Sequence, residues 1–137
     1  MSISDNLLEI KSYTLEGYKP VIDFESWRVA VLNYCDELLP ENITKMQRHD
    51  ETDEVFVLLK GEFTLFIGEG KEEVEKIHAV KLEPLKFYNV KKGVWHTHTL
   101  NKDAMVLIVE NQNTNNTNSP EIELSRAQRD TLIELAN

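Results

Sequence analysis

The sequence predicts an all-β protein, an antiparallel sandwich or barrel, with one short helix at its end. Short apolar segments with period-2 alternation follow one another between about residues 21 and 110, joined by short polar connections. Hardly any helical pattern interrupts them, which favours antiparallel strands over a parallel α/β sheet. A chain of 137 residues holds one core and is too short for two typical domains, so we expect a single domain over residues 1–137.

The first clear strand signal is SWRVAVLNY, residues 26–34. Its alternate positions differ in character, as expected for a strand with two distinct faces. In ITKMQRH, residues 43–49, an extended chain would place Gln47 and His49 on the same face. The sequence therefore predicts that these two side chains point in one direction.

The apolar run VFVLLKGEFTLFIG, residues 55–68, is interrupted by Gly61 and predicts two strands or one strong bend, closed by a hairpin at 68–70. Further strands are expected near residues 73–81, 86–90, 94–100 and 104–110. The polar stretch 111–120 predicts a solvated loop without a chemical role. Ser125 and Gln128 form a capping-box pattern, which predicts a helix over about residues 125–136 on the outside of the sheet.

Composition and charge exclude several partners. A net charge of −9 argues against nucleic acid and anionic membrane surfaces, because phosphate binding needs clustered Lys and Arg. Cys35 is the only cysteine, so a disulfide within the chain and a Cys-based zinc cluster are both excluded. The amino-terminal residues lack a basic segment followed by an apolar stretch, and no run is long enough to cross a bilayer. We expect a cytoplasmic protein.

The direction in which the Glu54 carboxylate points bears on the chemistry of the protein. In an extended strand it shares a face with Phe56 and Leu58, so it points either into the barrel or out to water. A carboxylate inside an apolar cavity costs several kcal/mol unless something pairs with it, so the inward orientation requires a metal, a cation or a proton. The alternative is that His49 and Glu54 belong to an exposed turn.

His96 and His98 are two residues apart, so a strand places both imidazoles on one face, and Gly93 allows a tight turn before them. Imidazole and carboxylate together suit Zn, Fe, Ni or Mn. The segments around residues 49–54 and 96–98 are therefore expected to converge on one divalent ion. For His98 the alternative is a hydrogen-bonded residue of the pocket wall.

The two segments together resemble the cupin superfamily. The first motif of that family has the shape HXH(X)3–4E(X)6G, and here Gln47, His49, Glu54 and Gly61 follow its spacing, with Gln47 in place of the first His. In the second motif, Gly93 and His96 keep their spacing. Lys91 stands where the family has Pro, and Leu100 where it has Asn. The resemblance covers about residues 27–110.

This resemblance implies a jelly roll, also called a double-stranded β-helix, with a metal or small ligand inside the barrel. It nominates Gln47, His49, Glu54 and His96 as metal ligands. Gln is a weaker ligand than imidazole for late first-row metals, and His98, on the same face as His96, is a replacement for the missing imidazole. Cupin domains also form dimers, and the apolar amino-terminal residues Leu7, Leu8, Ile10 and Tyr13 suit an exposed sheet edge, its own or that of a partner in a homodimer.

Three function classes follow. The first is a metal-dependent isomerase, lyase or hydrolase acting on a sugar or small carboxylic acid, with Glu51, Glu54 or His98 moving a proton. The second is a metal-free enzyme of the sugar-epimerase kind, with a His as base and a Tyr or Lys of the barrel as acid. The third is a non-catalytic protein that binds a small molecule.

Overall fold

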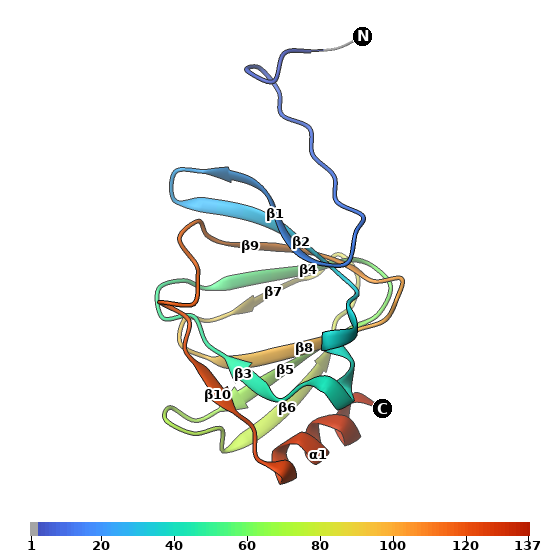
Figure 1. The fold of residues 1–137 in the computed structure, drawn as a ribbon, viewed down its shortest axis with the longest axis vertical. Helices are drawn as coiled ribbons and strands as arrows, with labels where there is room; N and C mark the ends of the chain where they lie inside the picture. The colour runs from blue at the N-terminus through green and yellow to red at the C-terminus, as the bar shows by residue number, and fades with distance from the viewer. Residues whose placement is uncertain (1–2) are drawn as a thin grey trace.

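Two facing antiparallel sheets and one C-terminal helix make up the computed structural model, which describes residues 3–137 (Figure 1). The strands are β1 (Gly17–Phe24), β2 (Trp27–Asn33), β3 (Lys45–Gln47), β4 (Glu54–Lys60), β5 (Phe63–Glu69), β6 (Lys76–Lys81), β7 (Phe87–Val90), β8 (Trp95–Leu100), β9 (Met105–Asn111) and β10 (Glu121–Glu123). Two single-turn 3-10 helices, η1 (Asp36–Leu38) and η2 (Pro40–Asn42), connect β2 to β3, and the α-helix is α1 (Arg126–Ala136). The first sheet has the order β1-β2-β9-β4-β7 and the second β10-β3-β8-β5-β6. The predicted all-β fold with a terminal helix is confirmed.

The main core lies between the two sheets. Phe56 and Leu58 of β4 and Val106 and Ile108 of β9 point inward and are at most 2% exposed. These residues alternate with outward-facing ones, as the sequence periodicity predicted. Because Glu54 has the same parity as Phe56 and Leu58, the strand directs its carboxylate into the barrel as well.

Gly61 separates β4 from β5, as predicted. Its φ of +81° lies in the left-handed region, which favours glycine, and a Cβ there would lie 2.4 Å from the Ala104 Cα. A side chain at this position would therefore collide with the β8–β9 connection. The tight turn depends on glycine for both reasons.

Two strands were missed by sequence reasoning. The sheet begins at Gly17, although Pro20 led the prediction to place the start of the barrel near residue 21. Proline is tolerated in β1 because this strand lies at the sheet edge, and the pairing with β2 shifts register between Pro20 and Ile22. The short β10 follows the polar stretch and pairs with β3, opposite Gln47 at Glu121.

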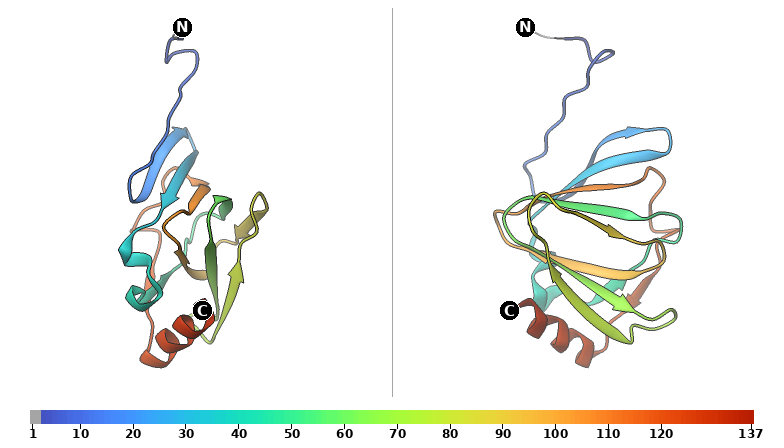
Figure 2. Two further views of the ribbon diagram at one scale, coloured as in Figure 1. Left: turned by 90° about the vertical axis from the view of Figure 1, so that its right-hand side faces the viewer. Right: turned by 180° about the vertical axis from the view of Figure 1, so that it is seen from behind.

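Helix α1 packs on the outer face of the second sheet, as predicted (Figure 2). Ser125 caps it, and the reciprocal bonds between Ser125 and Gln128 complete the capping box. Leu132 is fully buried in a second apolar cluster with Met46 and Phe66. Within residues 3–137, no helix combines the length and the apolar character needed to cross a membrane.

The amino-terminal segment, residues 3–16, runs away from the barrel (Figures 1 and 2). Asn33 ties its end to β2 by donating hydrogen bonds to the carbonyls of Tyr13 and Leu15. Leu7 and Ile10 are 78% and 76% exposed. The segment therefore does not cover a sheet edge of its own chain, which was one of the two expected arrangements.

Candidate metal centre

His49, Glu54 and His96 meet inside the barrel. The His96 Nε2 atom lies 2.9 Å from Glu54 Oε1, and the His49 Nε2 atom lies 3.2 Å from the same oxygen. The three potential ligand atoms all lie within 4.8 Å of one another, and each residue is at most 8% exposed. The two distant segments converge as the sequence indicated, and His49 and Glu54 do not form an exposed turn.

Local backbone geometry explains this convergence. Glu54 is the first residue of β4 and takes its inward direction from the strand parity. The backbone N–H of Gly93, whose φ is +82°, donates to the His49 carbonyl oxygen at 2.8 Å and joins the start of β8 to the end of β3. Gln47 pairs with His96 across these two strands. Both segments are therefore fixed by main-chain hydrogen bonds.

The donor set fits a divalent metal. It offers two imidazole nitrogens and one carboxylate oxygen, ligands that suit Zn, Fe, Ni and Mn. The other ring nitrogen of His96, Nδ1, lies 3.0 Å from the Val94 carbonyl oxygen. A carbonyl oxygen can only accept, so Nδ1 carries a proton and Nε2 faces the group with its metal-binding lone pair available when the ring is neutral.

The electrostatics of the group match its geometry. Burial alone would raise the pKa of Glu54, but the hydrogen bonds from His49 and His96 outweigh it and hold this pKa well below its usual range. Burial lowers and the Glu54 carboxylate raises the pKa of His49, and the net effect is a raised pKa.

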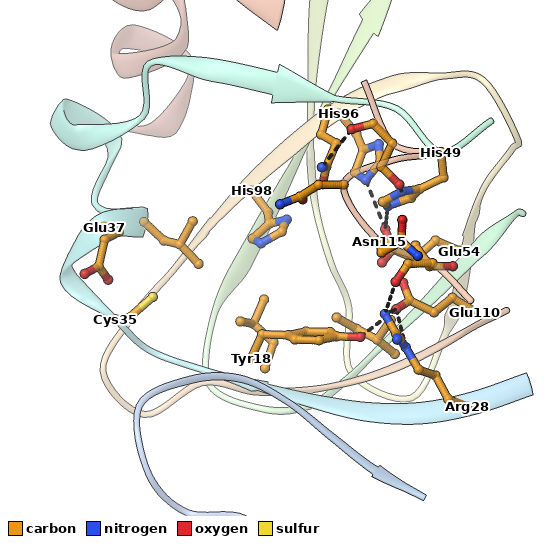
Figure 3. A pocket seen from close by; sticks show the side chains of 17 residues that line it. Tyr18, Arg28, Cys35, Glu37, His49, Glu54, His96, His98, Glu110 and Asn115 are labelled. Carbon is orange, nitrogen blue, oxygen red and sulfur yellow. Dashed lines mark hydrogen bonds and ion pairs between the residues drawn. The ribbon is translucent and has the colours of Figure 1, made fainter. Parts of the chain in front are cut away.

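The three residues line a pocket of about 450 Å³ (Figure 3). Gln47 also lines it, and its amide nitrogen donates to the Ser119 carbonyl oxygen at 3.1 Å. Figure 3 shows His49, Glu54 and His96, which we call the metal-ligating group as the candidate ligands, on one side and Cys35 and Glu37 on the other. Glu51, a candidate for proton transfer, does not line the pocket and accepts a hydrogen bond from Asn113 outside it.

Sequence reasoning missed a second polar cluster beside Glu54, formed by Tyr18, Arg28 and Glu110 (Figure 3). Glu110 Oε2 accepts hydrogen bonds from the Tyr18 hydroxyl at 2.5 Å and from Arg28 Nε and Nη2 at 2.9 and 2.6 Å. Burial and the neighbouring Glu54 nevertheless raise the pKa of Glu110 to about 7. The alternation of the two strands could have revealed this cluster. Arg28 lies on the same face of β2 as the core residues of that strand, and Glu110 lies on the same face of β9 as Val106 and Ile108.

His98 lines the pocket away from the metal-ligating group. It lies outside the set of close ligand atoms formed by His49, Glu54 and His96. Its ring stacks on Phe63 at a centroid distance of 5.2 Å, and its buried Nδ1 has no hydrogen-bond partner within residues 3–137. Burial lowers the pKa of His98 to about 4, so the ring is neutral at neutral pH.

The polar stretch between β9 and β10 takes part in the pocket. We call residues 112–120 the strap. Ser119 is 3% exposed and Thr114 8%, and Asn115 and Asn116 line the cavity. Ser119 Oγ lies 2.7 Å from His49 Nδ1. The expectation of a solvated loop without a role therefore does not describe this segment, whose polar side chains partly face inward.

No protein-family model and no curated protein matches this chain. Solved structures do resemble it. A cupin-2 domain protein from Shewanella frigidimarina has a TM-score of 0.51 at 14% identity, covering 73% of this chain and 85% of that one. Streptomyces PAC13 in a variant with uridine has a TM-score of 0.55 at 12% identity, with 85% and 87% covered.

A third similar structure is a variant of the 3,4-ketoisomerase QdtA from Thermoanaerobacterium thermosaccharolyticum in complex with TDP-4-keto-6-deoxyglucose. Its TM-score is 0.55 at 16% identity, with 88% of this chain and 79% of that one covered. Together with the two facing sheets, these likenesses show that the chain has the cupin fold, the jelly roll of that superfamily.

Proposed function

We propose that this protein is a metal-dependent enzyme that binds one divalent ion through His49, Glu54 and His96 and acts on a small polar molecule. The supporting observation is the convergence of two imidazole nitrogens and a carboxylate oxygen at the wall of a pocket. Structural metal sites are closed by four protein ligands, whereas a catalytic site keeps an open position for water or substrate. A three-residue set beside a cavity is the catalytic pattern.

The ion belongs to the group Zn, Fe, Ni and Mn, and when bound it polarises a carbonyl or hydroxyl oxygen of the substrate. Gln47, the fourth predicted ligand, has its amide nitrogen bonded to Ser119, so only its amide oxygen is available to an ion. His98 is neutral and has an unpaired ring nitrogen. It is our candidate for accepting a proton or a hydrogen bond from the substrate.

A sugar or small carboxylic acid, converted by an isomerase, lyase or hydrolase reaction, fits the size and polarity of the pocket. Its volume of about 450 Å³ suits a small molecule, with polar groups at the metal-ligating end and Leu32, Leu38 and Ile108 along the wall. PAC13 with uridine and QdtA with a TDP-sugar are similar folds that hold sugar-containing molecules, and they support a small-molecule partner here.

The metal-free enzyme is the second candidate, favoured by Gln47 in the position of the first motif histidine. In that case a His of the pocket is the base and a Tyr or Lys of the barrel the acid, and Glu54 lies within hydrogen-bond distance of both His49 and His96. A non-catalytic binding protein would need the pocket but neither of these arrangements.

Metal analysis separates these candidates. The protein purified without added metal, followed by zinc titration in a calorimeter, should show binding of one equivalent. His49→Ala should abolish it. His78→Ala is the matched control, because His78 lies on the surface, paired with Glu69. Absence of any metal in the parent protein and no uptake on titration would contradict the metal-dependent function and leave the metal-free enzyme and the non-catalytic binding protein.

We also propose a homodimer in which the amino-terminal segment of each chain packs on the other. Its exposed Leu7, Leu8 and Ile10 support this, because exposed apolar side chains gain stability by covering a partner surface. Light scattering at micromolar protein should give the dimer mass, and a monomer mass would contradict the proposal. A cytoplasmic location remains our expectation, consistent with a single cysteine.

A further inference from the structure

The strap determines which nitrogen of His49 faces the metal-ligating group. We infer that Ser119 is a positioning residue that holds His49 with its proton on Nδ1 and its Nε2 lone pair directed at the metal centre. The inference concerns the metal site of the proposed function and rests on it for its effect on metal affinity. The hydrogen-bond order itself follows from contacts among four residues of the strap, Asn113, Asn115, Asn118 and Ser119.

The first step is the orientation of the Asn118 side-chain amide. Asn118 Nδ2 donates to the Asn113 carbonyl oxygen at 2.9 Å, and Asn118 Oδ1 accepts from the Asn115 backbone N–H at 3.1 Å. A carbonyl can only accept and a backbone N–H can only donate, so the amide cannot be turned around without losing both bonds. Oδ1 is therefore fixed as the atom that faces Ser119.

The second step is the direction of the Ser119 hydroxyl. Ser119 Oγ lies 3.1 Å from Asn118 Oδ1, which is an acceptor only, so the hydroxyl proton is donated there. A hydroxyl has one proton to give. Its lone pairs therefore face His49 Nδ1 at 2.7 Å, and this nitrogen must carry the proton of that bond. His49 Nε2 is then the nitrogen that faces Glu54, at 3.2 Å from Oε1.

The third step is that the strap cannot easily move away. The backbone N–H of Arg48 donates to the Pro120 carbonyl at 3.1 Å, and that of Asp50 donates to the Asn118 carbonyl at 3.0 Å, so the chain around His49 is bonded on both sides of Ser119. Gln47 adds its amide bond to the Ser119 carbonyl. These bonds continue the β3–β10 pairing and hold the Ser119 side chain, 3% exposed, against the imidazole.

This arrangement gives both imidazoles the same orientation by different means. His96 is fixed by a backbone carbonyl of its own segment, whereas His49 depends on a side chain 70 positions away. Hydrogen-bond partners of this kind orient metal ligands, and their loss lowers metal affinity by about 10- to 100-fold. Gln47 contributes to this arrangement, because its amide nitrogen donates to the Ser119 carbonyl oxygen and so helps to hold the strap against His49.

The test uses the full chain and zinc as the probe. Ser119→Ala should lower zinc affinity in competition titrations by about 10- to 100-fold. Thr117→Ala, which removes a hydroxyl from the same strap but none that contacts His49, should retain the affinity of the parent. An unchanged affinity in Ser119→Ala would overturn the positioning role.

Nitrogen-15 NMR of the metal-free protein provides the readout that a merely structural role would not change. With four histidines in the chain, single substitutions assign the His49 signals. Because Glu54 also accepts from Nε2 in the metal-free protein, the readout is the Nδ1 proton: we expect it to be present and slow to exchange with water in the parent and in Thr117→Ala, and to exchange faster in Ser119→Ala. A parent ring that carries a proton on Nε2 alone would overturn the inference. If the parent protein binds no zinc, the metal function fails, while the same spectra still decide the hydrogen-bond order.

Discussion

Two histidines of strand β8, His96 and His98, line the same pocket but differ in their surroundings. His96 and His98 share a face of β8, yet their surroundings are opposite. His96 has a partner on each ring nitrogen, the Val94 carbonyl and Glu54. His98 stacks on Phe63 with Nδ1 unpaired, and burial holds its pKa near 4.

The difference shows that strand parity alone does not assign a chemical role. Parity places both rings inside the barrel, but only His96 lies within hydrogen-bond distance of a carboxylate and a carbonyl oxygen. The ring of His98 packs against Phe56 and Phe63. Burial without a charged partner in contact favours the neutral ring at His98.

The largest expected effect comes from removing each histidine in turn. His96→Ala should lower zinc affinity by at least about 100-fold, because it deletes one of three ligands. His98→Ala should leave the affinity within about threefold of the parent value, because its ring lies outside the ligand group. Calorimetry measures both. An equal loss in the two variants would remove the distinction between the two ends of the pocket.

Gln47→His should raise the affinity of the candidate metal centre for zinc. An imidazole is a stronger ligand than an amide oxygen, and position 47 pairs with His96 across the strands, so zinc affinity should rise by about tenfold. Gln47→Ala separates this gain from the loss of the bond to Ser119. Weaker binding in the His variant than in the Ala variant would show that an imidazole at position 47 does not reach the ion.

His98→Leu should stabilise the metal-free protein by about 1 kcal/mol, because it replaces a buried nitrogen without a partner by an apolar side chain. Denaturant unfolding measures the change. A matching loss of activity or ligand binding would indicate that the unpaired nitrogen is retained for the substrate. A clear loss of stability would instead show that the imidazole is better paired than its surroundings indicate.

The smallest expected effect concerns the pH dependence of stability. The folded protein keeps the Glu110 proton up to about pH 7, whereas the ordinary value for this carboxyl is 4.5. Folding therefore takes up a proton between these values, and this group makes the free energy of unfolding fall as pH rises through that window. Glu110→Gln should flatten this part of the curve in denaturant titrations of the metal-free protein. An unchanged slope would show that Glu110 is already ionised there.

Much of this architecture was predictable from short-range patterns. The alternation in β4 placed Glu54 on the same face as Phe56, and the match of His49, Glu54 and His96 to the family motifs indicated a shared site. Tyr18 was missed because Pro20 weakened the strand signal, and an edge strand tolerates proline. Ser119 lies in a polar stretch whose composition resembles any solvated loop. Its role depends on contacts with residues far away in sequence, which no local pattern contains.

The wide spacing of the contacting residues also has a consequence for how the molecule is made. Tyr18 bonds to Glu110 across 92 positions, and His49 bonds to Ser119 across 70. During synthesis on the ribosome, the pocket cannot close until nearly all of the chain has emerged. Structures dominated by such distant pairings fold slowly, because a long loop loses conformational entropy before the contact that closes it stabilises the chain. We expect the pocket to be among the last parts of the newly synthesised chain to fold.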